Sequence, residues 1–296
     1  MFNNDSPFLL PADEYGRQIM TERIFCECER AERYEIGRSV LGRSIEALKI
    51  GKGRGRVAIF GTHHALESIT ANVLYAFVYI MLSGNGRELI LGDCDRGLFL
   101  SMYTYFIIPC LNPDGVELRY HGEGETLLSD RQRRMSGGDY SSWQANGRGV
   151  DLNHNYDFGF AEYKEIERER GIMPGASLYS GEYPESEPET HAAAAFVRAL
   201  APKAVVSLHT QGEEIFYSPT AAARGAARMA ELTGYRLSMP TDTAAYGGLC
   251  DYTGGVLGIP SFTLELGRGK NPLSETLVPQ LVRRVGHALL RLPSLF

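Results

Sequence analysis

The sequence lacks an excess of positive charge, a long apolar run and a cysteine framework. Its formal net charge is −6, and no Lys/Arg cluster is dense enough to favour nucleic acid as the main partner. No stretch approaches 18 apolar residues, so we expect no transmembrane helix. The N-terminus has neither the basic start nor the apolar centre of a secretory signal. Five cysteines without a Cys-x-x-Cys pair are typical of reduced thiols, and we therefore expect a cytoplasmic protein.

The pattern that remains is that of a globular α/β protein, with short apolar runs alternating with amphipathic segments. It predicts a mostly parallel sheet with helices on both faces, in one catalytic domain over 35–296 with a helical N-terminal segment, 1–34, packed on it. We expect strands at 57–60, 103–110, 204–208 and 261–264, a hairpin over 35–51, and helices at 15–31, 68–82, 161–170, 189–200, 221–232 and 277–290. The polar segment 117–149 is interpreted as a long functional loop.

Chemically active side chains follow the ends of the predicted strands. His64 and Glu67 come just after the first strand, and His209 ends the third. A single His-x-x-Glu occurs often by chance, and a lone His at a strand end is usually structural. Because the carboxyl ends of parallel strands meet at one edge of the sheet, we expect the three side chains to converge there. Two imidazoles and a carboxylate form a three-ligand zinc site with an open position for water.

Two further residues complete a hydrolytic site. Glu265 ends the fourth predicted strand, where a carboxylate without a partner is costly, so it is either a buried ion-pair member or a general base with raised proton affinity. Arg148 follows the long polar segment and is our candidate for stabilising the oxyanion, the alternative being a surface arginine. Together these groups predict metal-assisted hydrolysis of an amide bond.

The order and spacing of five motifs resemble the zinc metallocarboxypeptidase (funnelin) family. The motifs are His64-Ala-Leu-Glu67, Asn112-Pro-Asp-Gly115, Gly149-Val-Asp-Leu-Asn-His-Asn155, His209-Thr-Gln-Gly-Glu-Glu214 and Phe262-Thr-Leu-Glu265. Within that family the chain looks most like bacterial γ-D-glutamyl-diamino-acid peptidases, which act on cell-wall peptides. The resemblance implies a single-domain α/β fold with a mixed, roughly eight-stranded sheet.

The resemblance also implies one zinc per chain, held by His64, Glu67 and His209, with Glu265 as base and proton shuttle. It places Asn153 and His154 where the family binds the substrate's terminal carboxylate, and Tyr246 near the substrate-capping loop. The implied partner is a small peptide, in this branch a muropeptide. The sequence does not fix the oligomeric state.

The chain departs from the family pattern at two positions. His154 stands where the carboxypeptidases have an arginine, and a neutral imidazole cannot replace a bidentate guanidinium. Gln144 follows Trp143 where the family carries the arginine beside the metal. Selection for a free C-terminal carboxylate is therefore in doubt, unless Arg268 or Lys270 supplies the missing cation. We expect the side chain of His63, next to a ligand, to point away from the site.

Four other interpretations remain open from the sequence. A zinc amidohydrolase or deacylase, or a conventional C-terminal carboxypeptidase, would use the same ligands and base. A non-haem iron oxygenase would share the two-His-one-carboxylate set but is typically a β-barrel. A non-catalytic binding protein would have no need to retain all three ligands and Glu265.

Overall fold

A mixed eight-stranded sheet with the order β1-β2-β4-β3-β5-β8-β6-β7 forms the centre of the molecule. The structure, a computed structural model, describes residues 2–3, 5–28, 30–90, 94–124 and 126–296. The strands are Glu32–Arg38 (β1), Ser44–Gly51 (β2), Gly55–Phe60 (β3), Tyr103–Ile108 (β4), Ala204–His209 (β5), Glu214–Tyr217 (β6), Arg236–Ser238 (β7) and Ser261–Glu265 (β8). The α/β class and the number of strands expected from the resemblance are thereby confirmed.

The four central strands, β4, β3, β5 and β8, run parallel to one another. Every residue of β5 is buried, as expected for a parallel strand covered on both faces. The carboxyl ends of these strands therefore meet at one edge, where open α/β sheets bind ligands. In the register of this edge, His209 of β5 lies beside Glu265 of β8.

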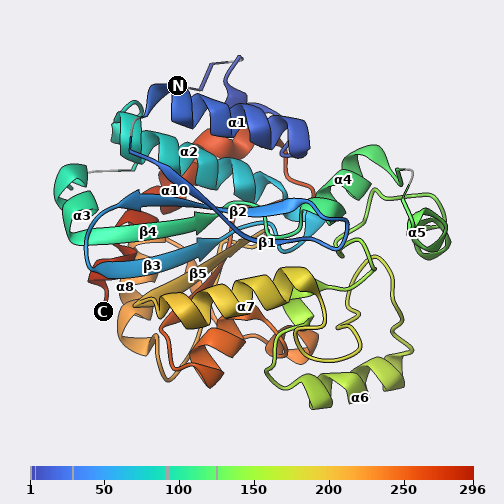
Figure 1. Ribbon diagram of the computed structural model, residues 1–296. Helices are drawn as coiled ribbons and strands as arrows, with labels where there is room; N and C mark the ends of the chain where they lie inside the picture. The colour runs from blue at the N-terminus through green and yellow to red at the C-terminus, as the bar shows by residue number, and fades with distance from the viewer. Residues whose placement is uncertain (1, 4, 29, 91–93, 125) are drawn as a thin grey trace.

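Helices cover both faces of the sheet (Figure 1). Val57 and Ile59 of β3 pack in the core cluster that holds α1, α2 and α10, whereas Ala58 and Phe60 pack in the second cluster, with α7. This alternation follows from the two-residue period of a strand. The described helices are α1 (Glu14–Glu27), α2 (Ile69–Ser83), α3 (Arg96–Met102), α4 (Pro113–His121), α5 (Ser129–Ser136), α6 (Phe160–Arg170), α7 (Pro188–Leu200), α8 (Ala223–Thr233), α9 (Leu249–Asp251) and α10 (Val278–Arg291).

The stretch Ala65–Ser83, which contains α2, is long and apolar enough to pass as a membrane-spanning helix. Inside the fold, 94% of its most apolar window is buried, so it is a core helix. The helix that we expected over 68–82 is thereby confirmed as α2, and polar residues such as Asn72 interrupt its apolar run. The Asn72 amide donates hydrogen bonds to the carbonyls of Phe8 and Leu10, which fastens the N-terminal segment to α2.

The expected hairpin over 35–51 is confirmed as the antiparallel pair β1 and β2. The expectation of a structureless segment over 117–149 is wrong, because the end of α4 and all of α5 lie within it. Asn112 and Pro113 start α4: the Asn112 side chain accepts a hydrogen bond from the Gly115 N–H, and proline takes the first helical position. The short strands β6 and β7 had no clear sequence pattern.

Candidate active site

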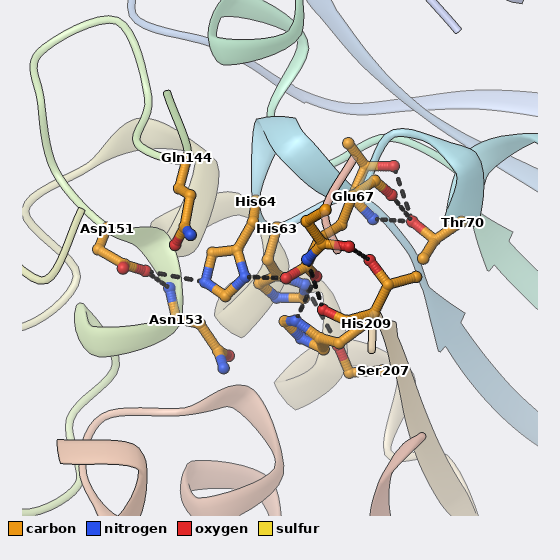
Figure 2. A network of polar contacts seen from close by, with 12 residues as sticks. His63, His64, Glu67, Thr70, Gln144, Asp151, Asn153, Ser207 and His209 are labelled. Carbon is orange, nitrogen blue, oxygen red and sulfur yellow. Dashed lines mark hydrogen bonds and ion pairs between the residues drawn. The ribbon is translucent and has the colours of Figure 1, made fainter. Parts of the chain in front are cut away.

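The three predicted ligands converge at the carboxyl edge of the sheet. After β3, the chain turns through Thr62 (φ +53°) into His64 and a 3-10 turn that carries Glu67. The Glu67 carboxylate joins the two imidazoles: Oε1 lies 3.0 Å from His64 Nδ1, and Oε2 lies 2.9 Å from His209 Nδ1. One donor atom from each residue lies within 4.8 Å of the others. Figure 2 shows the three side chains pointing toward one another.

The charges of this cluster suit a metal ion. Burial raises the pKa of the Glu67 carboxyl, but the imidazoles of His64 and His209 outweigh it and lower the pKa to about 2. Glu67 is therefore ionised at neutral pH. Two imidazoles and one carboxylate are the donor set of catalytic zinc sites with three protein ligands, so the residues present fit the metal.

The other ring nitrogen of each histidine ligand has a partner of its own. His64 Nε2 lies 3.0 Å from Asp151 Oδ1, and His209 Nε2 lies 3.0 Å from Ser207 Oγ. Asp151 is held in place because its Oδ2 accepts a hydrogen bond from the Leu178 N–H. Such partners fix the tautomer and the ring orientation, which leaves Nδ1 of each ligand free to face the metal position.

His63, which we expected to point away from the site, is not one of the three ligands, and its ring packs against His209. His63 is fully buried, with Nδ1 3.2 Å from Ser207 Oγ and Nε2 3.1 Å from the Tyr156 hydroxyl. Its ring stacks on that of His209, with 5.3 Å between centroids. Burial lowers the pKa of His63 well below its ordinary value, and the neighbouring imidazoles add to this effect, so the ring is neutral. Tyr156, His63 and Ser207 thus form a chain of polar contacts that ends on His209.

The Asn112 motif supports the site rather than forming part of it. The side-chain amide of Asn112 donates hydrogen bonds to the backbone carbonyls of His63, Gln144 and Ala145. The Gln144 carbonyl also accepts a hydrogen bond from the Ala65 N–H. The segment that follows Trp143 is therefore fixed beside the ligand turn, and Figure 2 shows the side chain of Gln144 near His64.

A cavity of about 150 Å³ opens beside the ligands. It is lined by His64, Asn153, His154, His209, Phe216, Tyr217, Pro240, Ala244, Gly248, Cys250, Asp251, Thr263 and Glu265. Burial raises the pKa of Glu265 well above its ordinary value, and the nearby Glu67 carboxylate raises it further, whereas His64 opposes the shift. A carboxylate with raised proton affinity at the wall of the cavity has the property required of a general base.

The structure places the other predicted residues in two groups. Asn153 and His154 line the cavity, and His154 is oriented by a 2.9 Å hydrogen bond from Nδ1 to the Tyr246 carbonyl and by stacking on Tyr163. Tyr246 itself is not among the lining residues, and its ring lies near Tyr163. The role proposed for Tyr246 stays a prediction.

The two predicted arginines also lie outside the cavity lining. Arg148 Nη1 is 3.7 Å from the Glu187 carboxylate, and Arg268 Nε is 2.9 Å from that of Glu213. The Arg268 side chain is 77% exposed. Both arginines are therefore ion-paired at or near the surface, and their predicted roles stay predictions.

An open metal position next to a proton-accepting carboxylate defines the class of metal-dependent hydrolases. Comparisons with known proteins give the family: the zinc carboxypeptidase family matches residues 27–283. The chain belongs to the zinc carboxypeptidase family.

Among curated proteins, a relative described as gamma-D-glutamyl-L-diamino acid endopeptidase 1 from Lysinibacillus sphaericus is 31% identical over 248 residues. The alignment covers 80% of this chain but only 61% of the relative. Among solved structures, thrombin activatable fibrinolysis inhibitor matches 98% of this chain and 78% of its own with a TM-score of 0.71 and 23% identity. Murein-tripeptide amidase MpaA from Escherichia coli O157 matches 88% of this chain and 91% of its own, with a TM-score of 0.55 and 19% identity. These two structures show the shared fold.

Proposed function

We propose that this protein hydrolyses the amide bond between γ-D-glutamate and a diamino acid in cell-wall peptides. The relative from Lysinibacillus sphaericus supports the proposal by its description, as does the murein-tripeptide amidase by its fold and name. Both names describe those proteins. The alignment with the relative from Lysinibacillus sphaericus covers 61% of that relative, which is less than two thirds of its length.

The composition of the cavity carries the proposal. Within the part of the chain that the structure describes, no lysine or arginine lines the cavity beside the ligands. Proteins that select a free carboxylate commonly hold it with a charge-assisted, often bidentate, contact from arginine. At the position where the resemblance implies a carboxylate clamp, this chain has Asn153 and His154. The cavity is therefore suited to a substrate other than the C-terminus of an ordinary peptide.

The proposed chemistry assigns one role to each residue of the site. His64, Glu67 and His209 hold zinc, which when bound lowers the pKa of water and polarises a substrate carbonyl. Glu265 takes the proton from the attacking water on a carboxylate oxygen and then passes it to the nitrogen of the leaving amine. Asp151 and Ser207 keep the two histidine ligands in the required orientation.

A digest of defined muropeptides, analysed by mass spectrometry, tests the proposal. Tri- and tetrapeptide stems with L-Ala-γ-D-Glu followed by meso-diaminopimelate or lysine are offered beside ordinary peptides and N-acyl amino acids. We expect cleavage after γ-D-glutamate that is lost in Glu265→Gln. Release of C-terminal residues alone would favour a conventional carboxypeptidase, and turnover of N-acyl amino acids alone would favour a deacylase.

A further inference from the structure

A second cavity, of about 650 Å³, lies between α1 and the strands β1 and β2. Arg33 of β1 and Glu46 of β2 line it from the sheet, and Tyr75 of α2 and Cys110 contribute to its lining as well. We call it the α1 cavity. Its volume is in the range of small-molecule binding sites, and it has no lining residue in common with the catalytic cavity. A molecule bound here therefore touches none of the residues that line the catalytic cavity.

One face of α1 is turned toward this cavity, and this face is polar. The lining residues of the helix recur at the three- and four-residue spacing of a single helical face: Glu14, Arg17, Gln18, Thr21, Glu22 and Phe25. A second face, which carries Met20 and Ile24, is fully buried in the core. A helix that packs its inner face on a sheet has an apolar stripe there. The polar residues of α1 therefore face a space that the protein itself does not fill.

Most charged groups of the α1 cavity neutralise one another. The Arg43 guanidinium lies 3.1 Å from the Glu14 carboxylate, and the Arg33 guanidinium lies 3.6 Å from the Glu46 carboxylate. These pairs match two of the three arginines and two of the three glutamates that line the cavity. One cation and one anion of the cavity wall remain.

The remaining cation and anion are Arg17 and Glu22, on neighbouring turns of α1. The Arg17 side chain is 12% exposed, its Nη1 donates a hydrogen bond to the Ala12 carbonyl, and the Glu117 carboxylate is 3.7 Å from Nη2. A guanidinium has five N–H donors, so Arg17 has donors to spare for an anion. Glu22 accepts a hydrogen bond from the Gln18 amide, and among the described residues no lysine, arginine or histidine forms an ion pair with it.

We propose that the α1 cavity binds a short peptide with free ends, with the C-terminal carboxylate on Arg17 and the N-terminal ammonium on Glu22. Five residues of helix separate Arg17 from Glu22 by about 7.5 Å along the axis. An extended dipeptide spans about 7 Å, which matches this separation. Phe25 and Tyr75 supply apolar surface for a peptide side chain. The site is separate from the catalytic one, so it does not depend on which bond the enzyme cleaves.

Calorimetry with a dipeptide and its blocked derivatives tests the site. L-Ala-L-Phe, its C-terminal amide and its N-acetyl derivative are titrated into zinc-loaded protein with excess acetohydroxamate, which occupies the metal position and prevents turnover. We expect L-Ala-L-Phe to bind about 10- to 100-fold more tightly than the amide, as for a hydrogen bond between charged groups. It binds about two- to fivefold more tightly than the N-acetyl derivative, a smaller ratio because Glu22 is exposed.

Two variants assign each end of the peptide to its residue. Arg17→Gln keeps an N–H for the Ala12 carbonyl and removes the charge, so the ratio of the affinities for acid and amide falls toward one. Glu22→Gln does the same for the ratio of free amine to N-acetyl derivative. Arg23→Gln, on the exposed part of α1 outside the cavity lining, leaves both ratios unchanged.

Gln18→Trp tests the cavity with both charged groups in place. Gln18 is exposed and lines the cavity, so an indole there narrows the space for the peptide without disturbing the core. We expect binding of L-Ala-L-Phe to be lost while zinc content and Tm stay unchanged. An acid that binds no better than its amide, or an affinity that neither Arg17→Gln nor Gln18→Trp changes, would overturn the proposal. An unchanged amine ratio in Glu22→Gln would contradict the ammonium contact.

Discussion

Glu67 and Glu265 are two carboxylates at the same edge of the sheet, and their surroundings shift their pKa values in opposite directions. Glu67 lies between the imidazoles of His64 and His209, and its pKa falls to about 2. Glu265 faces the cavity beside the Glu67 carboxylate, and its pKa rises well above the ordinary value. One edge of a sheet thus provides a permanent anion for a metal and a group able to accept a proton. The difference comes from the neighbouring charges, since burial alone raises the pKa of both carboxyls.

The largest effect is expected from Glu265→Gln, which removes the proton acceptor and keeps the shape. We expect kcat to fall by about 10³-fold, within the range known for general bases. Zinc content, measured by atomic emission, stays at one per chain because Glu265 is not a ligand. The matched control is Glu165→Gln on the exposed surface of α6. Substantial remaining activity would show that another group accepts the proton.

The second largest effect is expected from Asp151→Asn, which weakens zinc binding by the cluster that contains Glu67. The change removes the charge next to His64 Nε2 and leaves an acceptor in place. We expect the dissociation constant for zinc to rise by about 10- to 100-fold, the usual effect of such partners of metal ligands. Competition with a chromophoric chelator measures it. An unchanged constant would mean that Asp151 serves only the loop that it holds through Leu178.

A smaller effect is expected from His63→Phe, which breaks the chain from Tyr156 to His209. Ser207 loses the partner at 3.2 Å that orients its hydroxyl toward the ligand. We expect zinc affinity to fall by a few-fold to about tenfold and the visible spectrum of the cobalt-substituted protein to shift. His63→Asn offers Ser207 an acceptor again and is expected to recover part of the affinity. If His63→Phe and His63→Asn had the same zinc affinity and the same spectrum, the contact from His63 to Ser207 would have no part in orienting His209.

Glu189 is a third buried carboxylate whose pKa is shifted, and it is not adjacent in sequence to any of the three metal ligands. It is fully buried, and burial, assisted by the nearby Asp114 carboxylate, raises its pKa to about 8. In the unfolded chain Glu189 releases its proton near the ordinary carboxyl pKa, whereas the folded chain keeps this proton up to about pH 8. The free energy of unfolding therefore falls as pH rises between these two pKa values. The slope is on the order of 1.4 kcal/mol per pH unit between about pH 5 and 8. Denaturant unfolding of the unmodified protein and Glu189→Gln measures the difference, and parallel pH profiles would contradict it.

The sequence predicted the site residues that lie at or just after the ends of strands. His64, His209 and Glu265 follow short apolar runs, and the carboxyl ends of parallel strands must share an edge. Asn153 and His154 were placed by the resemblance, and both line the cavity.

The partners of these residues depend on the packing of segments distant in sequence. In the sequence, Ser207 is a single polar residue inside an apolar strand. Its neighbours in sequence do not indicate that it contacts both His63 and His209. Arg148 was chosen by its position after a polar segment, whereas the fold brings it to Glu187.

The central claim is that His64, Glu67 and His209 form one zinc site at the carboxyl edge of the sheet. Anomalous diffraction at the zinc edge, from crystals of the zinc-loaded protein, tests it most directly. The account predicts a single strong peak per chain, bound by Nδ1 of both histidines and by the Glu67 carboxylate, with Nε2 of His64 still on Asp151. A peak elsewhere, or coordination through Nε2, would contradict it.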